Sequence, residues 1–155
     1  MLFDFASAKH VGVLCSPQNE TDTEQIKVFL QYLLQKGIQY TVLGYFNGKK
    51  IPENFLYWKG MDFITRQDLN FFFIPRGPVI DKFINEPFDM LINGNVAGFF
   101  PMEYISQLSM AKCKVGIMRE EKLSCDLMID IKKNQTIEYF LTNLKTYLSN
   151  LRFSQ

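Results

Sequence analysis

Two short stretches of the chain nearly repeat one another and carry acidic residues at a spacing that suits paired-carboxylate chemistry. They are FDMLIN, from Phe88 to Asn93, and CDLMID, from Cys125 to Asp130. Two carboxylates brought together can act as a general acid and a general base. Three apolar residues between polar ends also describe a buried strand whose ends lie in water. We favour this structural interpretation.

The segment CSPQNETDTE, which begins at Cys15, occupies the position of a phosphate-binding loop in an α/β protein. A cysteine phosphatase would need an arginine six residues after the cysteine, and Thr21 stands there. A P-loop would need glycines and a lysine, which are absent. Ser16, Asn19 and Thr21 partly match the composition of a flavodoxin-like FMN loop. They are candidate ligand-binding residues, and a plain capped loop is the simpler alternative.

A second candidate loop is NGNVAG, which begins at Asn93. Gly94 and Gly98 lie between a strand end and a helix start, where backbone amides and the helix dipole can receive an anion. The spacing is not GxGxxG, no cation is adjacent in the sequence, and glycines in a tight turn are the commoner explanation. If the fold has a pocket, we place it here, with Ser16 across from it. Asn93, Gly94 and Asn95 therefore join the candidate ligand-binding residues.

Strands and helices must position these loops. The apolar, β-branched run His10–Cys15 predicts a strand that is covered on both faces. A helix should follow, because Thr21 and Glu24 have the spacing of a capping box and an apolar stripe continues at helical spacing. Gly37 has the position at which a left-handed residue ends a helix.

The rest of the chain alternates in the same way, which predicts an α/β fold. Only seven residues separate the last two expected strands, too few for a helical crossover, so we expect an antiparallel hairpin with Cys113 opposite Ile131. The expected class is a three-layer, Rossmann-like or flavodoxin-like sandwich with a mostly parallel sheet and one antiparallel hairpin edge. The expected strands are His10–Cys15, Tyr40–Phe46, Met61–Thr65, Phe88–Asn93, Cys113–Met118 and Asp126–Ile131, and the expected helices are Thr21–Lys36, one within Val79–Asn85, one from Pro101 and Thr136 to about Leu151.

Composition limits the partners. The 155 residues fit a single domain, with its core over residues 8–151. Lysine and arginine number 17 against 16 acidic residues, a net charge of +1, so we expect no nucleic-acid partner. No apolar run approaches the ~20 residues of a membrane span, so we expect no membrane partner.

Cysteine and histidine usage points to a reduced protein without a metal. Three cysteines without a CxxC pair and a single histidine favour neither a disulfide framework nor a zinc site. The start of the chain, MLFDFASAKH, lacks the features of a signal peptide, so a cytoplasmic location is expected. We expect no cofactor.

Aromatic residues gather in the segments without clear periodicity. Three consecutive phenylalanines, Phe71, Phe72 and Phe73, cannot all face one core from a regular element, and Trp58 ends another aromatic run, FLYW. An exposed aromatic patch would mark a homodimer or protein-partner surface formed by these four residues. The alternative is a satellite core beneath a long loop.

Several segments in order resemble a small family of Bacteroidetes proteins catalogued as a domain of unknown function: KHVGVLC, VLGYF, DLNFF, EPFDMLIN, ISQLSMAKCKVGIM and CDLMIDI. The resemblance runs from about Ala8 to Leu151. It implies a cytoplasmic α/β domain and gives no activity. Family members often have an acid where this chain has Asn93, a departure that argues against carboxylate chemistry there. The stretch FDMLIN…LSMAKCKVGI is also similar to the first domain of heptosyltransferase-like glycosyltransferases, which need a second domain for the nucleotide sugar.

Together these observations predict a non-catalytic ligand-binding or protein-interaction module, without catalytic residues. The small-molecule ligand is not specified by any motif. The alternative is a small enzyme, or a carrier of FMN or a nucleotide, that uses the strand-end pocket near Ser16 and Gly94.

Overall fold

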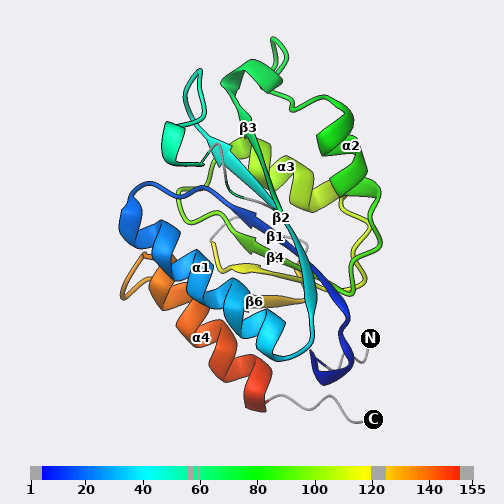
Figure 1. The fold of residues 1–155 in the computed structure, drawn as a ribbon, viewed down its shortest axis with the longest axis vertical. Coiled ribbons are helices and arrows are strands. Elements are labelled where there is room, and N and C mark those ends of the chain that lie inside the picture. The colour runs from blue at the N-terminus through cyan, green and yellow to red at the C-terminus, as the bar shows by residue number, and fades with distance from the viewer. Residues whose placement is uncertain (1–4, 56–57, 59, 120–124, 151–155) are drawn as a thin grey trace.

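The computed structural model describes residues 5–55, 58, 60–119 and 125–150, which form an α/β fold with one six-stranded sheet (Figure 1). The strands lie in the order β3-β2-β1-β4-β5-β6, and every pair of neighbours is parallel. The strands are β1 (His10–Cys15), β2 (Gln39–Phe46), β3 (Met61–Thr65), β4 (Met90–Gly94), β5 (Lys114–Ile117) and β6 (Leu127–Ile129), and the helices are α1 (Glu20–Gln35), α2 (Pro78–Asn85), α3 (Phe100–Leu108) and α4 (Ile137–Asn150).

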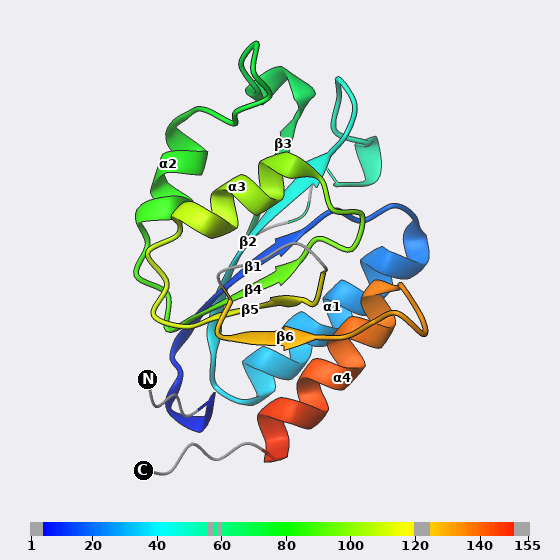
Figure 2. The same cartoon turned by 180° about the vertical axis from the view of Figure 1, so that it is seen from behind.

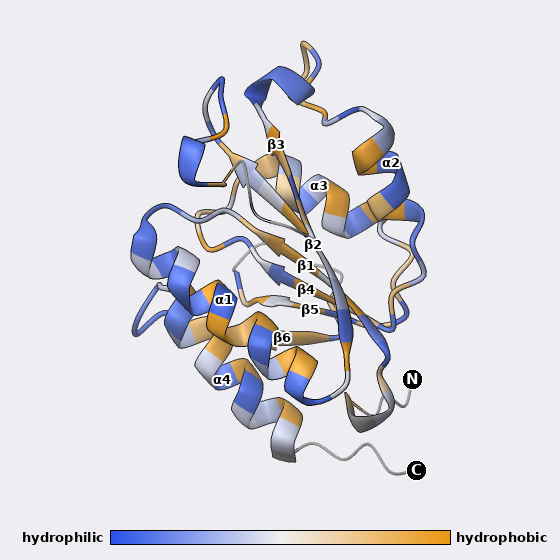
Figure 3. Cartoon of the chain, in the orientation of Figure 1, coloured by the Kyte–Doolittle hydropathy of each residue, from blue (hydrophilic) through white to orange (hydrophobic). Residues whose placement is uncertain are grey.

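Helices cover both faces of the sheet. Helices α1 and α4 lie side by side on one face, and α2 and α3 lie on the other (Figures 1 and 2). Each pair closes its own apolar cluster against alternate residues of the strands. Figure 3 shows mainly apolar central strands between helices that carry hydrophilic residues. This is the burial that a parallel sheet requires, and it explains the unbroken apolar runs of the sequence. Within the described residues, no helix combines the length and the apolar character needed to cross a bilayer.

Helix α1 begins earlier than the sequence predicted. The side chain of Asn19 accepts a hydrogen bond from the backbone N–H of Asp22 at 2.8 Å and is the N-cap. The predicted capping box of Thr21 and Glu24 is therefore wrong, since both residues lie inside the helix. Asn19 and Thr21 both belong to the favoured N-cap residue types, with asparagine ranked above threonine, and the capping-box spacing pointed to the weaker of the two.

The predicted end of α1 is confirmed. Gly37 adopts φ +76°, and the N–H of Ile38 donates to the carbonyl of Leu33 at 2.9 Å. A left-handed residue with this backbone bond closes a helix end and reverses the chain into the next strand.

The antiparallel hairpin predicted at the end of the sheet is wrong. Strands β5 and β6 are parallel, with Val115 beside Leu127 and Ile117 beside Ile129. The same register continued backwards brings Cys113 level with Cys125 and not with Ile131. The residues that connect the two strands include 120–124, which lie outside the described residues.

The short strands explain why no helical crossover is needed here. Strand β5 has four residues and β6 has three. Four residues of strand are only about 13 Å long, whereas nine extended residues reach about 30 Å. The chain can therefore return from the end of β5 to the start of β6 within residues 118–126. The usual minimum length applies to longer strands joined by a packed helix.

The repeated aspartates bind the backbone of neighbouring strands at the amino edge of the sheet. Asp89 Oδ2 accepts from the N–H groups of Lys9 and His10, at 2.8 and 3.0 Å. Asp126 Oδ2 accepts from the N–H of Lys114 at 2.8 Å. Since β5 lies between β4 and β6, two strand spacings, or about 10 Å, separate the two aspartates. They are structural and do not form a carboxylate pair.

Candidate functional site

Two adjoining cavities lie at the carboxyl ends of the strands. After β1 the chain passes into α1 on one face of the sheet, and after β4 it passes into α3 on the other. Loops that diverge in this way leave a crevice between them, which is the usual ligand position in an open α/β sheet. The smaller cavity has a volume of about 410 Å³ and the larger about 990 Å³. Val96, Ala97 and Gln135 line both.

Asn95 organises the loop between β4 and α3, and it is fully buried. Its Nδ2 donates to the carbonyl of Phe99 at 2.9 Å and to Glu103 Oε2 at 2.9 Å. Its Oδ1 accepts from the N–H of Phe99 at 3.2 Å and from the Ser16 hydroxyl at 3.5 Å. A buried amide whose donors and acceptor are all used holds its loop in one conformation. The wall of the crevice is therefore formed before any ligand binds.

Asn93 takes part in the same network. Its Nδ2 donates to Glu103 Oε2 at 2.8 Å, and its Oδ1 accepts from the N–H of Asn95 at 3.2 Å. The Glu103 carboxylate thus receives two amide donors and lines the larger cavity. Sequence reasoning missed Glu103, because its position in the first turn of a helix is ordinary for a glutamate.

Two glycines of this loop are needed for close approaches. A Cβ on Gly94 would lie 2.9 Å from Ile137 Cδ1 and 3.2 Å from the Leu14 carbonyl, so the first turn of α4 packs directly on the end of β4. Gly98 adopts φ +76°, and a Cβ there would lie 3.4 Å from Arg119 Nη1. Gly98 has the left-handed backbone of a turn, as predicted, whereas Gly94 is the last residue of β4 and allows close packing there.

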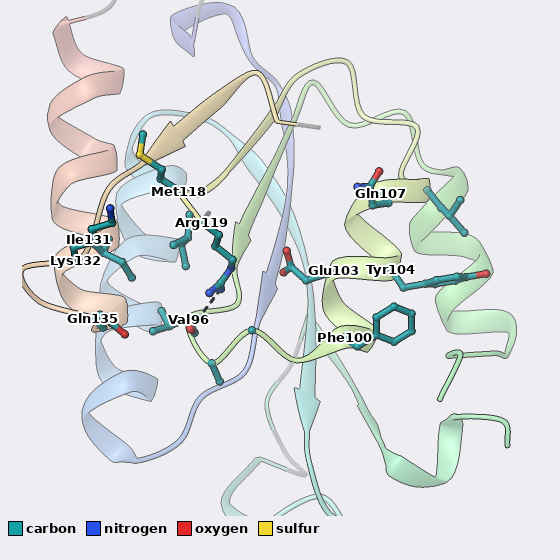
Figure 4. A pocket seen from close by; sticks show the side chains of 14 residues that line it. Val96, Phe100, Glu103, Tyr104, Gln107, Met118, Arg119, Ile131, Lys132 and Gln135 are labelled. Carbon is teal, nitrogen blue, oxygen red and sulfur yellow. Dashed lines mark hydrogen bonds between the residues drawn. The ribbon is translucent and has the colours of Figure 1, made fainter. Parts of the chain in front are cut away.

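Arg119 supplies the cation that the loop lacks in sequence. It follows the end of β5, and its Nη2 donates to the carbonyls of Asn95 and Val96, the latter at 3.4 Å. Its Nε–H is buried and has no hydrogen-bond partner among the described residues. Figure 4 shows the Arg119 guanidinium directed at the loop that carries Val96, with Glu103 projecting into the larger cavity from α3. A buried donor without an acceptor is costly, and a ligand oxygen would satisfy it.

The predicted ligand-binding residues fall into three groups. Ser16, Asn19 and Gly94 line the smaller cavity. Asn93 and Asn95 lie in the wall, where their side chains bind protein groups. Thr21 is exposed on α1 and is not among the lining residues of either cavity. Its neighbour Asp22 lines the smaller cavity instead.

The cysteine thiols are poor nucleophiles. Burial raises the pKa of Cys15, which lines the smaller cavity, to about 12. Burial, with Asp126 nearby, raises the pKa of Cys113 to about 11. The pKa of Cys125 is raised by burial and then by the Glu103 carboxylate. Thiolates are the reactive species, so at neutral pH these three residues do not support nucleophilic catalysis.

We expect the stability of the protein to reflect the Cys15 pKa at alkaline pH. The folded pKa of about 12 lies above the usual 9.0, so the contribution of this thiol is complete below pH 9 and is lost as the pH rises. One such group lowers the free energy of unfolding by about 1.4 kcal/mol per pH unit. The free energy of unfolding, measured with urea from pH 8 to 11, should therefore fall more steeply for the wild type than for Cys15→Ala. Equal slopes would contradict the buried thiol.

The predicted aromatic interface is divided between two places. Phe71, Phe72 and Phe73 are all exposed at the tip of the loop between β3 and α2. Trp58 instead packs against Phe55 and Phe63, with ring centroids 5.3 and 6.1 Å away. Its partners are thus internal, as in the satellite core that the sequence left open, and Leu56 and Tyr57 of the same run lie outside the described residues.

A protein-family model matches most of the chain. The model described as "Family of unknown function (DUF6913)" matches residues 3–151. No curated protein matches the chain. The match covers both loops of the crevice and all four helices.

Proposed function

The chain belongs to the family of unknown function DUF6913, and we propose that it is a binding module for a small phosphate-bearing ligand. The observation that carries the proposal is the Arg119 guanidinium, which lines the crevice with a buried Nε–H that has no partner among the described residues. A guanidinium offers a planar fork of donors that matches phosphate oxygens. Lys132 is a second cation on the same cavity.

The other walls favour a nucleotide. Phe100, Tyr104 and Leu108 give the larger cavity an apolar side on α3, which suits a flat ring. The Glu103 carboxylate accepts hydrogen bonds and suits a sugar hydroxyl. With about 990 Å³ in the larger cavity, there is room for a ligand of nucleotide size.

The proposal extends to a Rossmann-like fold. The strand order β3-β2-β1-β4-β5-β6 is that of dinucleotide-binding proteins, in which ligands lie where the order reverses. Here the reversal falls between β1 and β4, beside Ser16 and Gly94. The loops lack the usual GxGxxG spacing, so in this proposal the Arg119 side chain replaces part of what glycine-loop amides supply.

A small enzyme is the second candidate, and the position of Glu103 favours it. A carboxylate that lines the same cavity as a guanidinium can act as a general base on a bound ligand. Incubation with ADP distinguishes the two, because a binding module returns the nucleotide unchanged whereas an enzyme converts it. A yellow preparation would instead indicate an FMN carrier.

Titration calorimetry with ADP tests the proposal. We expect wild-type protein to bind ADP and Arg119→Ala to bind it at least tenfold more weakly, since a charge-assisted bidentate contact is lost. Lys132→Ala should bind roughly three- to fivefold more weakly without a change in melting temperature, because Lys132 is exposed and carries charge alone.

The matched control is Arg76→Ala, which removes an exposed arginine from the loop before α2. It should bind ADP as the wild type does. Arg119 also donates hydrogen bonds to two loop carbonyls, so the melting temperature of its variant must be measured beside its ADP binding. If Lys132→Ala binds ADP normally and Arg119→Ala loses only stability, Arg119 is structural and the proposal is wrong. Absence of ADP binding by the wild type contradicts the nucleotide assignment.

Four sequence-based statements stay predictions beside this proposal. They are the single-domain organisation over residues 1–155, the cytoplasmic location, the Bacteroidetes origin and the likeness to heptosyltransferase-like enzymes. The likeness to heptosyltransferase-like enzymes would agree with a nucleotide-sugar ligand. Titration calorimetry with UDP-glucose tests whether the protein binds such a ligand.

A further inference from the structure

Three consecutive aromatic side chains project from the loop between β3 and α2. Phe71 is 90% exposed, Phe72 72% and Phe73 59%. The loop extends beyond the sheet at the top of Figures 1 and 2, and its tip is apolar in Figure 3. A soluble domain rarely leaves several adjacent large apolar side chains in water without a binding role.

The loop is built to hold this tip in one shape. Asn70 Oδ1 accepts from the N–H groups of Phe72 and Ile74, at 2.8 and 3.0 Å. The Asn70 N–H donates to the Ile74 carbonyl at 2.9 Å, and Leu69 and Pro75 form an antiparallel bridge below it. The aromatic residues are therefore presented on a small, closed hairpin.

Phe73 holds an unfavourable backbone conformation at this tip. It has φ +63°, and it is the one non-glycine residue with positive φ in the described part of the chain. Glycine or asparagine would adopt this conformation at less cost. A bulky aromatic residue in a strained, exposed position costs folding free energy, and such residues cluster at binding sites.

Basic residues surround the base of the loop. Arg66 and Arg76 are exposed on its two sides, and the Arg66 N–H bonds to the Gly48 carbonyl, which brings the exposed Lys49 and Lys50 alongside. Asp68 is the one acid between residues 65 and 76, and its Oδ2 accepts from the Thr65 N–H at 2.8 Å.

We propose that this loop inserts Phe71, Phe72 and Phe73 into the interface of an anionic lipid membrane. Apolar side chains enter the headgroup boundary while lysine and arginine contact anionic lipids. The exposed fractions of the three phenylalanines add up to about two whole side chains, an exposed area of roughly 300–500 Å². A stable protein interface buries about 800 Å² on each partner, so a second copy or another protein fits this narrow tip less well. Such peripheral binding needs no spanning segment and is therefore compatible with a chain that has no long apolar run.

Vesicle flotation tests the proposal with full-length protein. Wild type should float with vesicles of equal parts phosphatidylcholine and phosphatidylglycerol and should bind pure phosphatidylcholine at least tenfold more weakly. The variant Phe71→Ser/Phe72→Ser/Phe73→Asn should lose binding at least tenfold. Asparagine accepts the left-handed conformation, so its melting temperature should not fall, which separates lost binding from lost folding.

Two further variants complete the test. Arg66→Gln/Arg76→Gln should weaken binding to the anionic vesicles about 25-fold, near fivefold for each charge. Val28→Ser/Met110→Ser removes two exposed apolar side chains elsewhere and should bind as the wild type does. The proposal is overturned if wild type stays with the unbound fraction, if the aromatic variant floats normally, or if gel filtration shows a wild-type dimer that this variant dissociates, which would assign the tip to a second copy.

Discussion

Replacing Gly12 with alanine is expected to lower the free energy of unfolding by about 3 kcal/mol. Gly12 lies in β1, and an added Cβ would lie 2.6 Å from Cε2 and 2.7 Å from Cδ2 of Phe88. The Phe88 ring is fully buried and packs against Phe83 and His10, with ring centroids 4.9 and 4.8 Å away. Because the ring is fully buried and packed against these two neighbours, the ring or the strand must shift to relieve the overlap. Urea unfolding measures the loss.

Gly48→Ala is the matched control, since a Cβ there meets nothing within 4 Å. It should change stability by less than about 0.5 kcal/mol. Phe88→Leu removes part of the obstructing ring. The double variant Gly12→Ala/Phe88→Leu should therefore lose about 1–2 kcal/mol less free energy of unfolding than the sum of the losses of the two single variants. Strict additivity, or equal effects of the two glycine variants, would show that the close approach does not determine stability.

The elements that could be predicted from the sequence are those whose signals are local. The run His10–Cys15 is apolar on both sides because β1 is central and covered by helices on both faces. Gly37 marks the end of α1 because left-handed geometry selects for glycine. The direction of β6 was not predictable in this way. It depends on how far a short connection reaches between two short strands, which residue types do not encode.

The candidate site shows the same division. Both crevice loops were found from the sequence, because polar residues and glycines at strand ends are a local signal, and Ser16 and Gly94 line one cavity as expected. Arg119 was not found, since its contact with Asn95 joins residues 24 positions apart. The one sequence signal available was a lone arginine directly after a buried strand. Asn93 and Asn95 stay predicted ligand-binding residues, and in the structure their buried side chains bond to protein groups.

Asp89→Ala is expected to lower the free energy of unfolding by about 2–3 kcal/mol, because two hydrogen bonds to a charged acceptor are lost at once. The carboxylate joins the backbone of Lys9 and His10 to the start of β4, so it holds two central strands in register. Its ion pair with Lys112 is long, at 3.5 Å, and that lysine is exposed, so little of the loss belongs to it. Lys112→Ala is the control and should change stability by less than about 0.5 kcal/mol.

Asp89→Asn separates the charge from the hydrogen bonds, because its amide oxygen can still accept from both N–H groups. We expect this variant to lose only about 1 kcal/mol at pH 7. The hydrogen bond from the Lys9 amide holds the pKa of the Asp89 carboxyl below its usual 3.8. The His10 amide and Lys112 lower this pKa further, whereas partial burial opposes them. A lowered folded pKa stabilises the protein above the unfolded pKa and ceases to do so as the pH falls through the folded value. The difference in free energy of unfolding between wild type and Asp89→Asn should therefore shrink below about pH 4. A difference that stays constant down to pH 2 would mean that the shape of this side chain, and not its charge, joins β1 to β4.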